Sequence, residues 1–424
     1  MKKIVWLLVV GILMVKYVVF SQNNYLNLDS LIVEAKQNNP QLKALRSKVM
    51  ASESKVGQVS AWEPPQIGVE FFNSPIQSFP NPFKNQMEYD YFIQQMFPFP
   101  GKIGNMKKAA HNNALMTNQE YHTLEKKIIR DIENSYYDLF FIQKKIEINK
   151  DNQELMKQFV EIAARQYEVG MGRQPDIIRS QTELSTLINE GINLQKEATD
   201  ATTMINIIIN REANSPLGIV PEADDSIPVL TYERISRLAF ENRPELKGMQ
   251  FNIEMNKSEL AFSRREYYPD LMVRLMYKNM TNTGNDFWSA MFGVNVPFAF
   301  WSKNKYTNKV EEDEANIQKA EEDYNSMKNM ITYDVQNALV KLETNRNLKD
   351  LSKNTIIPQA EQTMQSTIAA YQNGKTEFLM VLDAYKMLFM SRLDYYMYLM
   401  NFMQAKAQLE QAVGLDLNEI ISNQ

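Results

Sequence analysis

The sequence has no cysteine, only two histidines, and no long apolar segment after residue 20. Without cysteine the chain has no disulfide, thiolate metal ligand or cysteine nucleophile. His111 and His122 are eleven residues apart, which is not a metal-ligand spacing. The close glycine pairs lack the lysine or third glycine of a phosphate-binding loop; they are Gly170-x-Gly172 and Gly101-x-x-Gly104. We therefore predict that the protein is not an enzyme and has no catalytic residues, cofactor or resident metal.

The first 21 residues have the organisation of a secretion signal. Lys2 and Lys3 form a basic start, residues 4–20 are almost wholly apolar, and Ser21 precedes a polar stretch. An uncleaved signal-anchor helix is the alternative, although about 17 apolar residues is the short limit for spanning a bilayer. Because no later segment approaches a transmembrane helix, any further membrane contact would have to be made by strands.

The charge of the chain is mildly acidic. Removing residues 1–21 takes away three lysines and no acidic residue, so the formal net charge falls from −5 to −8. No block of basic residues suits a nucleic acid. We therefore expect no nucleic-acid partner.

The chain contains one structural unit written twice. Residues 38–45 (NNPQLKAL) match residues 242–249 (NRPELKGM), and the same offset of 204 carries Pro65 onto Pro269. Further on, residues 97–99 match 296–298, and residues 167–170 match 371–374. Four landmarks in one order indicate tandem duplication of a whole unit. We predict a first repeat over 22–213, a linker over 214–231, a second repeat over 232–414 and a tail over 415–424.

Each repeat is expected to be mainly helical with one β-hairpin. Helical spacing predicts a first helix over 41–62 and over 245–268, and the alternating apolar residues that follow predict hairpins over 66–98 and 270–297. Three- and four-residue apolar steps predict long helices over about 102–168 and 303–372, each followed by a returning helix over 175–213 or 376–413. The fold class is therefore mainly α with a β-barrel portion. Four strands per chain cannot close a barrel, so a membrane role requires an oligomer, whereas a soluble two-hairpin domain would not.

Aromatic residues lie beside proline at all four strand–helix junctions. Rings collected at one end of every strand are typical of a membrane-interface girdle. Taken singly, each cluster could instead plug a core. The interface residues that we predict are Trp62, Phe97, Phe99, Tyr268, Phe298 and Trp301.

With these motifs in view, the sequence resembles the TolC-like outer-membrane efflux family over nearly the whole mature chain. The resemblance rests on Asn38-Asn39-Pro40 with Leu42, the Pro98 and Pro297 junctions, and two tip motifs, Tyr167-x-x-Gly170-x5-Asp176 and Tyr371-x-x-Gly374-x3-Phe378. It implies a homotrimer in outer-membrane lipid, with a twelve-strand barrel and a long periplasmic α-helical barrel. It also implies docking to a periplasmic adaptor (membrane fusion) protein and to an inner-membrane pump of the resistance-nodulation-division type.

The resemblance also implies a gate at the periplasmic tip. Carried over by position, the gate residues are Tyr371, Asp383 and Asp176, with Glu377 compensating for Met380 at a position that often carries a second aspartate. The adaptor would contact the tip turns at Tyr167, Gly170, Gly172, Gly374 and Lys375. Independently of the family, an oligomer would copy each carboxylate into a ring that attracts cations. For Asp176, a helix N-terminal residue favoured by the dipole is the alternative interpretation.

The two tips also differ in sequence. The first has two more residues between its glycine and the expected helix restart, and only the second carries Leu382-Asp383-Ala384. We therefore expect the gate mainly in the second copy.

The substrate is left open by the sequence. The tip sequence over 170–176 looks most like the heavy-metal-cation efflux branch of the family. Five methionines at near-helical spacing could bind Cu(I) through their thioethers, although flexible methionine also fills helix seams; they are Met387, Met390, Met397, Met400 and Met403. Drug efflux remains open, as do two other roles: the outer-membrane conduit of a protein secretion system and a periplasmic coiled-coil scaffold without a pore.

Overall fold

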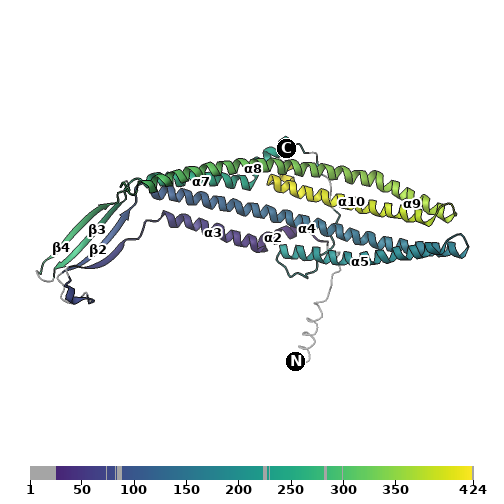
Figure 1. Ribbon diagram of the computed structural model, residues 1–424, viewed down its shortest axis with the longest axis horizontal. Coiled ribbons are helices and arrows are strands. Elements are labelled where there is room, and N and C mark those ends of the chain that lie inside the picture. Colours follow the sequence, from purple (N-terminus) through teal and green to yellow (C-terminus); the bar gives the residue numbers. More distant parts are fainter. Residues whose placement is uncertain are drawn as a thin grey trace, which may run out of the picture. The chain divides into compact units, whose positions relative to one another are not determined.

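The computed structural model describes residues 25–72, 74–81, 83, 88–222, 227–228, 230–280, 284–297 and 299–422. The predicted signal over 1–21 and the predicted interface residue Phe298 lie outside these residues. The helices in chain order (Figure 1) are α2 Leu28–Asn38, α3 Pro40–Ser60, α4 Lys102–Glu168, α5 Gln174–Ile208, α6 Tyr232–Asn242, α7 Pro244–Arg265, α8 Lys303–Leu351, α9 Ile357–Gln372, α10 Phe378–Val413 and α11 Leu417–Ser422. The prediction of a mainly helical chain with a small strand portion is confirmed.

The longest helix, α4, is continuous over 67 residues, or about 100 Å at 1.5 Å per residue. Proline is absent from it, and its single glycine lies in the first turn. Ile128, Ile132 and Leu139 are buried along one side of the helix. Packing of this apolar side stabilises the long helix more than the intrinsic helix propensity of its residues does. Within the described residues no helix is both long enough and apolar enough to cross a bilayer.

The long helix that we expected over 303–372 is interrupted. A π-helical turn, Ser352–Ile356, separates α8 from α9. Pro358 follows directly, at the start of α9. Because proline has no N–H and its ring crowds the preceding turn, the regular hydrogen-bond ladder cannot continue through it, and one widened turn accommodates the change.

Two short helices that the sequence analysis missed, α2 and α6, precede α3 and α7. Each pair is separated at the residue before a proline, Asn39 before Pro40 and Arg243 before Pro244, where the chain leaves the helical region. Both of these residues are buried. The Asn39 amide donates to the carbonyl of Ile208 at 2.9 Å, and Arg243 pairs with Asp334 at 2.8 Å. The proline motifs therefore mark anchored breaks in the helices.

The four strands form one antiparallel sheet in the order β1-β2-β3-β4. Their bounds are β1 Gln66–Phe72, β2 Glu88–Phe97, β3 Leu271–Met280 and β4 Asp286–Val294. The middle pairing joins strands from different halves of the sequence, with Tyr91 opposite Tyr277. The outer edges of β1 and β4 pair with no other strand in the described part of the chain.

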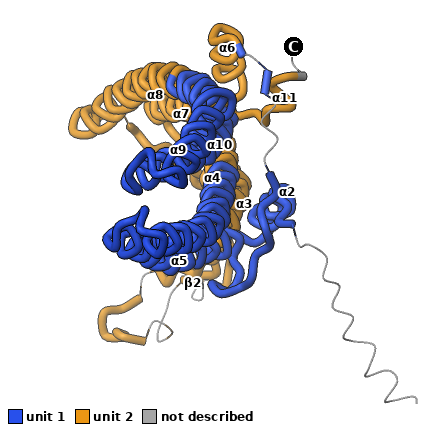
Figure 2. Tube along the Cα trace, turned by 90° about the vertical axis from the view of Figure 1, so that its right-hand side faces the viewer, with its two compact units in different colours: residues 1–39, 128–230, 337–411 blue, residues 40–127, 231–336, 412–424 orange. Residues whose placement is uncertain are grey.

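The chain divides into two compact units (Figure 2). The first comprises residues 1–39, 128–230 and 337–411, and the second comprises 40–127, 231–336 and 412–424. Each unit takes segments from both halves of the sequence. The first unit holds the α4–α5 and α9–α10 turns, and the second holds the sheet and its junctions with the helices.

Candidate functional site

The α4–α5 turn is a glycine-dependent helix end followed by a capped helix start. Gly170 has φ +75°, and the N–H groups of Met171 and Gly172 both donate to the carbonyl of Gln166, at 2.9 and 2.7 Å. A Cβ on Gly172 would lie 2.8 Å from the backbone nitrogen of Tyr167. The two predicted glycines are therefore required by the backbone path.

Asp176 is the third residue of α5, where its carboxylate accepts from the Arg173 N–H in a capping box. Pro175 fits the first turn of this helix. Both residues thus belong to the helix. Our expectation of a longer first turn is wrong, because α5 and α10 each begin four residues after their glycine.

The α9–α10 turn has the same construction. Gly374 has φ +68°, and the Lys375 N–H donates to the carbonyl of Ala370 at 2.9 Å. The Gln166 amide donates to the carbonyl of Gln372 at 3.2 Å, so the end of α4 contacts the end of α9. The two predicted tip motifs therefore lie side by side in the first unit.

A cavity of about 380 Å³ lies between the two turns. It is lined by Tyr371, Asp176 and Glu377 from the predicted gate set, together with Arg173, Arg179 and Lys375. Arg173 and Glu377 form an exposed ion pair of 3.4 Å across it. No sequence motif marked either arginine, and only the fold places them opposite the acidic residues.

Tyr371 is the buried member of this group. Its side chain packs against Phe378 with ring centroids 5.4 Å apart, and its hydroxyl has no hydrogen-bond partner among the described residues. Burial, followed by the charge of Asp176, raises the pKa of the hydroxyl. Tyr371 is therefore held in place by packing within the protomer.

Asp383 does not line this cavity. It lies on α10 with its side chain exposed and makes no ion pair or hydrogen bond within the described part of the chain. The neighbouring residues Val381, Leu382 and Ala384 are buried in an apolar cluster with Phe159. The structure thus brings three of the four predicted gate residues together and leaves the fourth on an open helix face.

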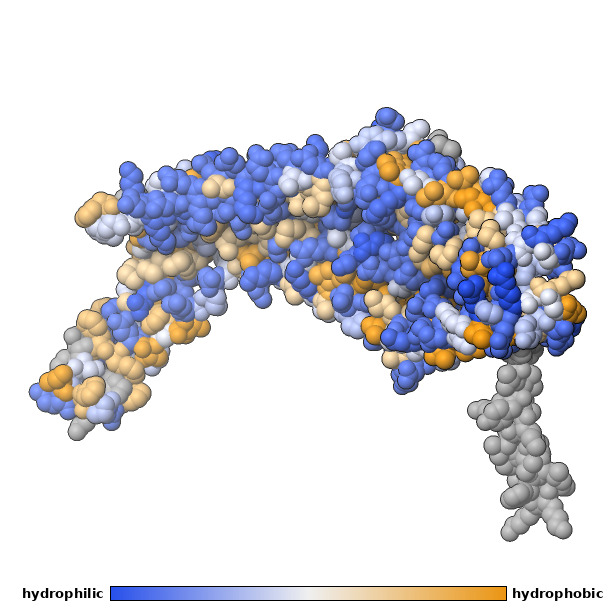
Figure 3. All heavy atoms as spheres, turned by 45° about the vertical axis from the view of Figure 1, so that its right-hand side comes forward, coloured by the Kyte–Doolittle hydropathy of each residue, from blue (hydrophilic) through white to orange (hydrophobic). Residues whose placement is uncertain are grey.

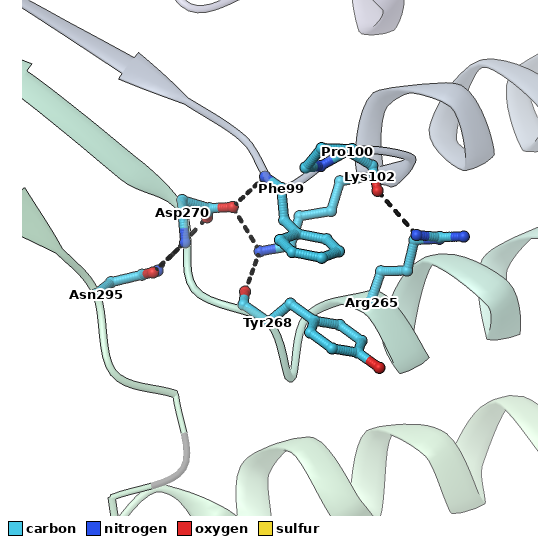
Figure 4. Close-up of polar contacts among 7 residues, drawn as sticks. All are labelled: Phe99, Pro100, Lys102, Arg265, Tyr268, Asp270 and Asn295. Atoms are coloured by element: carbon cyan, nitrogen blue, oxygen red, sulfur yellow. Dashed lines mark hydrogen bonds and ion pairs between the residues drawn. The ribbon is translucent and has the colours of Figure 1, made fainter.

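A second polar site ties the sheet to the helices in the second unit (Figure 4). Lys102 Nζ lies 2.7 Å from Asp270 Oδ1 and donates to the carbonyl of Tyr268 at 3.1 Å. The same Oδ1 accepts from the Phe99 N–H at 2.7 Å. Arg265 donates to the carbonyl of Pro100 at 2.8 Å. These contacts fix the β2–α4 and α7–β3 junctions to each other. No sequence pattern had predicted them.

The predicted interface aromatics pair around these junctions. Phe99 stacks on Tyr268 with centroids 4.5 Å apart, and Trp62 meets Phe97 edge-on at 5.4 Å. Trp301, 77% exposed, contacts Phe300. The side chains of Trp62, Tyr268 and Trp301 are each at least half exposed, so these rings remain available to an environment outside the protomer.

Among the described residues, no group of three or more histidine, cysteine, aspartate or glutamate side chains could hold a metal ion. The geometry instead supplies a polar turn region in one unit, and in the other a sheet fastened to helices by an ion pair.

The sequence profile of the family described as "Outer membrane efflux protein" matches this chain twice, over residues 31–210 and 235–415. The cobalt-zinc-cadmium resistance protein CzcC of Cupriavidus metallidurans is 22% identical over 330 residues, which cover 74% of this chain and 75% of that protein. The cation efflux system protein CusC of Escherichia coli K12 is 18% identical over 380 residues, covering 86% and 81%.

Solved structures of similar proteins share the fold. A crystal structure of CusC superposes with a TM-score of 0.80 at 16% identity, covering 93% of each chain. The outer membrane protein VceC of Vibrio cholerae superposes with a TM-score of 0.76 at 15% identity, covering 92% of this chain and 96% of that one.

Proposed function

Because this chain belongs to the outer membrane efflux protein family, whose members are channels rather than enzymes, we propose that it is one protomer of a homotrimeric conduit. The conduit carries small solutes, metal cations among them, from the periplasm to the exterior. It works with a periplasmic adaptor and an inner-membrane pump of the resistance-nodulation-division type. The family resemblance inferred from the tip and junction motifs is thereby confirmed, and the assembly and cargo are our proposal.

The observation that carries the proposal is the apolar face of the sheet. Alternate residues of all four strands place exposed apolar side chains on this face, including Trp288 at 80% and Phe292 at 73%. Paired residues share a face, so these side chains line up across the sheet; they are Ile67, Val69, Tyr91, Ile93, Leu275, Tyr277, Trp288 and Phe292. Figure 3 shows apolar side chains gathered over the strands, beside hydrophilic ones. A contiguous apolar face of this kind suits lipid better than water.

The ion pairs of the strands lie on the opposite face of the sheet. Arg274 pairs with Glu70 at 2.9 Å and lies 3.8 Å above the ring of Phe92. Lys278 pairs with Glu88 at 3.2 Å and with Asp90 at 3.0 Å. Apolar side chains outside and ion pairs inside are the pattern of a strand barrel around an aqueous lumen.

The free edges of β1 and β4 support the oligomer. An open edge cannot face hydrocarbon, because its N–H and C=O groups would stay unsatisfied. If β4 of one copy pairs with β1 of the next, three copies give a closed barrel of about twelve strands. The exposed aromatics at the junctions would then lie at the periplasmic surface of the outer membrane.

In this assembly the α4–α5 and α9–α10 turns form the periplasmic tip. We propose that Tyr371, Asp176 and Glu377 hold the tip closed together with Asp383 from the open face of α10. The adaptor would meet the turn residues Tyr167, Gly170, Gly172, Gly374 and Lys375. The predicted repeat boundaries, 22–213 and 232–414, are retained as part of this proposal.

Metal cations are the preferred cargo because two of the relatives are named for them, as a cobalt-zinc-cadmium resistance protein and a cation efflux protein. Drug or polypeptide export would require the same conduit. Reading the neighbouring genes for a pump and an adaptor would separate these classes of cargo.

Location and assembly can be tested by fractionation. Outer membranes from expressing cells should yield, after detergent extraction, an oligomer on gels that heat converts to a monomer. Recovery as a monomer in the soluble periplasmic fraction would overturn the conduit and favour a coiled-coil scaffold.

The gate can be tested by conductance in planar bilayers. We expect Asp383→Ala to change the conductance and to lower the preference for cations, because the ring of carboxylates is removed. Glu343→Ala is the matched control, because it also removes one carboxylate but lies on α8, away from both turns. It should leave conductance and cation preference unchanged. If conductance and selectivity were the same in wild type and Asp383→Ala, Asp383 would not be a gate residue.

A further inference from the structure

One face of α10 carries only methionine and aspartate at heptad-like spacing. Six positions stepping by three and four along the helix lie on one stripe, as in a heptad seam. The stripe members near the tip are well exposed: Met380 at 53%, Met387 at 45% and Met390 at 53%. We call this set the α10 stripe; it consists of Met380, Asp383, Met387, Met390, Asp394 and Met397.

The opposite side of α10 is occupied by the protomer itself. Phe378, Val381 and Tyr385 are buried in the apolar cluster of the first unit. Filling of the protomer core therefore does not explain the three exposed methionines of the stripe, Met380, Met387 and Met390.

The stripe has an excess of negative charge. Neither Asp383 nor Asp394 makes an ion pair or hydrogen bond with any residue that the structure describes. The basic residues on its flanks point elsewhere: Lys386 pairs with Glu183 of α5 at 3.1 Å, and Arg392 pairs with Glu361 of α9 at 2.8 Å. Carboxylates without cationic partners attract a cation from solution.

The two aspartates in the stripe argue against a helix–helix seam as its purpose. Burying it against another apolar helix would also bury two unpaired carboxylates, at a cost of several kcal/mol each. A water-filled conduit imposes no such cost. The stripe also contains Asp383, which our proposed function places in the conduit wall, and residues at heptad spacing share that wall.

The thioethers select the kind of cation. Met387 and Met390 are at i and i+3, with Cβ atoms about 5–6 Å apart, so both sulfur atoms can reach one ion from a single helix. Thioethers bind soft monovalent ions such as Cu(I) and Ag(I), whereas divalent zinc takes nitrogen, oxygen and thiolate ligands. Methionine side chains are unbranched and adaptable, so they can approach an ion without moving the backbone.

We propose that Met387 and Met390, flanked by Asp383 and Asp394, form a transit site for a soft monovalent metal cation on the conduit wall. This inference rests on the proposed function and narrows its cargo to ions that thioethers bind. The carboxylates concentrate the cation, and the two sulfur atoms coordinate it.

The test is Ag(I) binding to the purified, detergent-solubilised full-length protein in chloride-free buffer, measured by equilibrium dialysis. Met387→Leu with Met390→Leu conserves volume and removes both thioethers. The control changes two equally exposed methionines on other helices, Met204→Leu (55% exposed) and Met330→Leu (53%). Zn(II) is measured in parallel as a cation that thioethers bind poorly.

We expect the Met387/Met390 double variant to bind Ag(I) about tenfold or more weakly than wild type, and the Met204/Met330 control to match wild type. Zn(II) binding should be the same in all three proteins. Equal Ag(I) affinity in wild type and the Met387/Met390 variant would overturn the site, as would an equal loss in the control.

Gel mobility of the unheated oligomer separates this failure from failure of the proposed function. If wild type and both variants form the heat-sensitive outer-membrane oligomer while Ag(I) binding is unaffected by the Met387/Met390 change, the transit site is wrong and the conduit stands. If wild type forms no oligomer, the conduit itself is wrong and the transit site fails with it.

Discussion

Lys102 offers the sharpest test of how the sheet is fastened to the helices. Its side chain is 9% exposed and that of its partner Asp270 is 17% exposed. In Lys102→Met the Asp270 carboxylate loses its counter-charge but keeps the Phe99 N–H as a donor. Removing one partner of a buried pair costs about 3–5 kcal/mol. Because Asp270 stays partly hydrated and hydrogen-bonded, we expect about 2–3 kcal/mol for opening of this junction.

The assay is amide hydrogen exchange, read by mass spectrometry on peptides covering residues 97–104. Exchange reports the free energy of local opening. Since each 1.4 kcal/mol is a factor of ten, a loss of 2–3 kcal/mol should speed exchange roughly 30- to 150-fold. The effect should be confined to this junction and to the start of β3, where Asp270 lies.

Lys303→Met is the matched control. Lys303 is the first residue of α8, as Lys102 is of α4, but its side chain is exposed and has no ion pair within the described residues. It should leave exchange at its own junction within about threefold of wild type, as expected for an exposed charge. Exchange in Lys102→Met within threefold of wild type would refute the reasoning. A double variant, Lys102→Met with Asp270→Asn, should lose less than the sum of its single changes, because the two side chains interact.

Four further changes test the turns and a carboxylate of α7. Tyr371→Phe should raise the free energy of unfolding by about 1 kcal/mol, because it removes a buried hydroxyl that has no partner among the described residues; a loss of stability in denaturant titrations would show a missed hydrogen bond. Gly374→Ala should cost about 1 kcal/mol for its left-handed backbone alone, whereas Gly172→Ala should cost more, because its Cβ would meet backbone atoms; thermal unfolding showing the reverse order would contradict the turn geometry. Burial, then the charge of Asp313, raises the pKa of Glu259, so its contribution to stability is full below the unfolded-state pKa and lost as pH rises through the folded-state pKa. Glu259→Gln should therefore stabilise slightly at pH 7, by less than about 0.5 kcal/mol for so exposed a group, and not at pH 4; a larger gain at pH 4 in denaturant titrations would reverse the assignment.

Local patterns in the sequence determined the elements and their kinds. Helical and alternating periodicities predicted the long α4 helix and the two hairpins, since each depends on which face of its own segment is apolar. The tip turns at Gly170 and Gly374 were expected from the family resemblance, and the positive φ of both glycines gives the physical reason for glycine there. The interruption before Pro358 could have been predicted from the sequence, because proline ends the regular ladder wherever it stands.

Contacts between distant segments were decided only by the tertiary structure. The Lys102–Asp270 pair spans 168 residues and Arg173–Glu377 spans 204, and neither lysine nor arginine carries a local signal of its partner. The pairing of β2 with β3, which joins the two halves of the sequence, depends on how the long helices bring the hairpins together. For the methionines of α10, composition and spacing allowed both a helix seam and a metal path. The burial of the opposite helix face shows that the protomer core does not need the exposed methionines, and this is the observation on which the transit site that we propose is built.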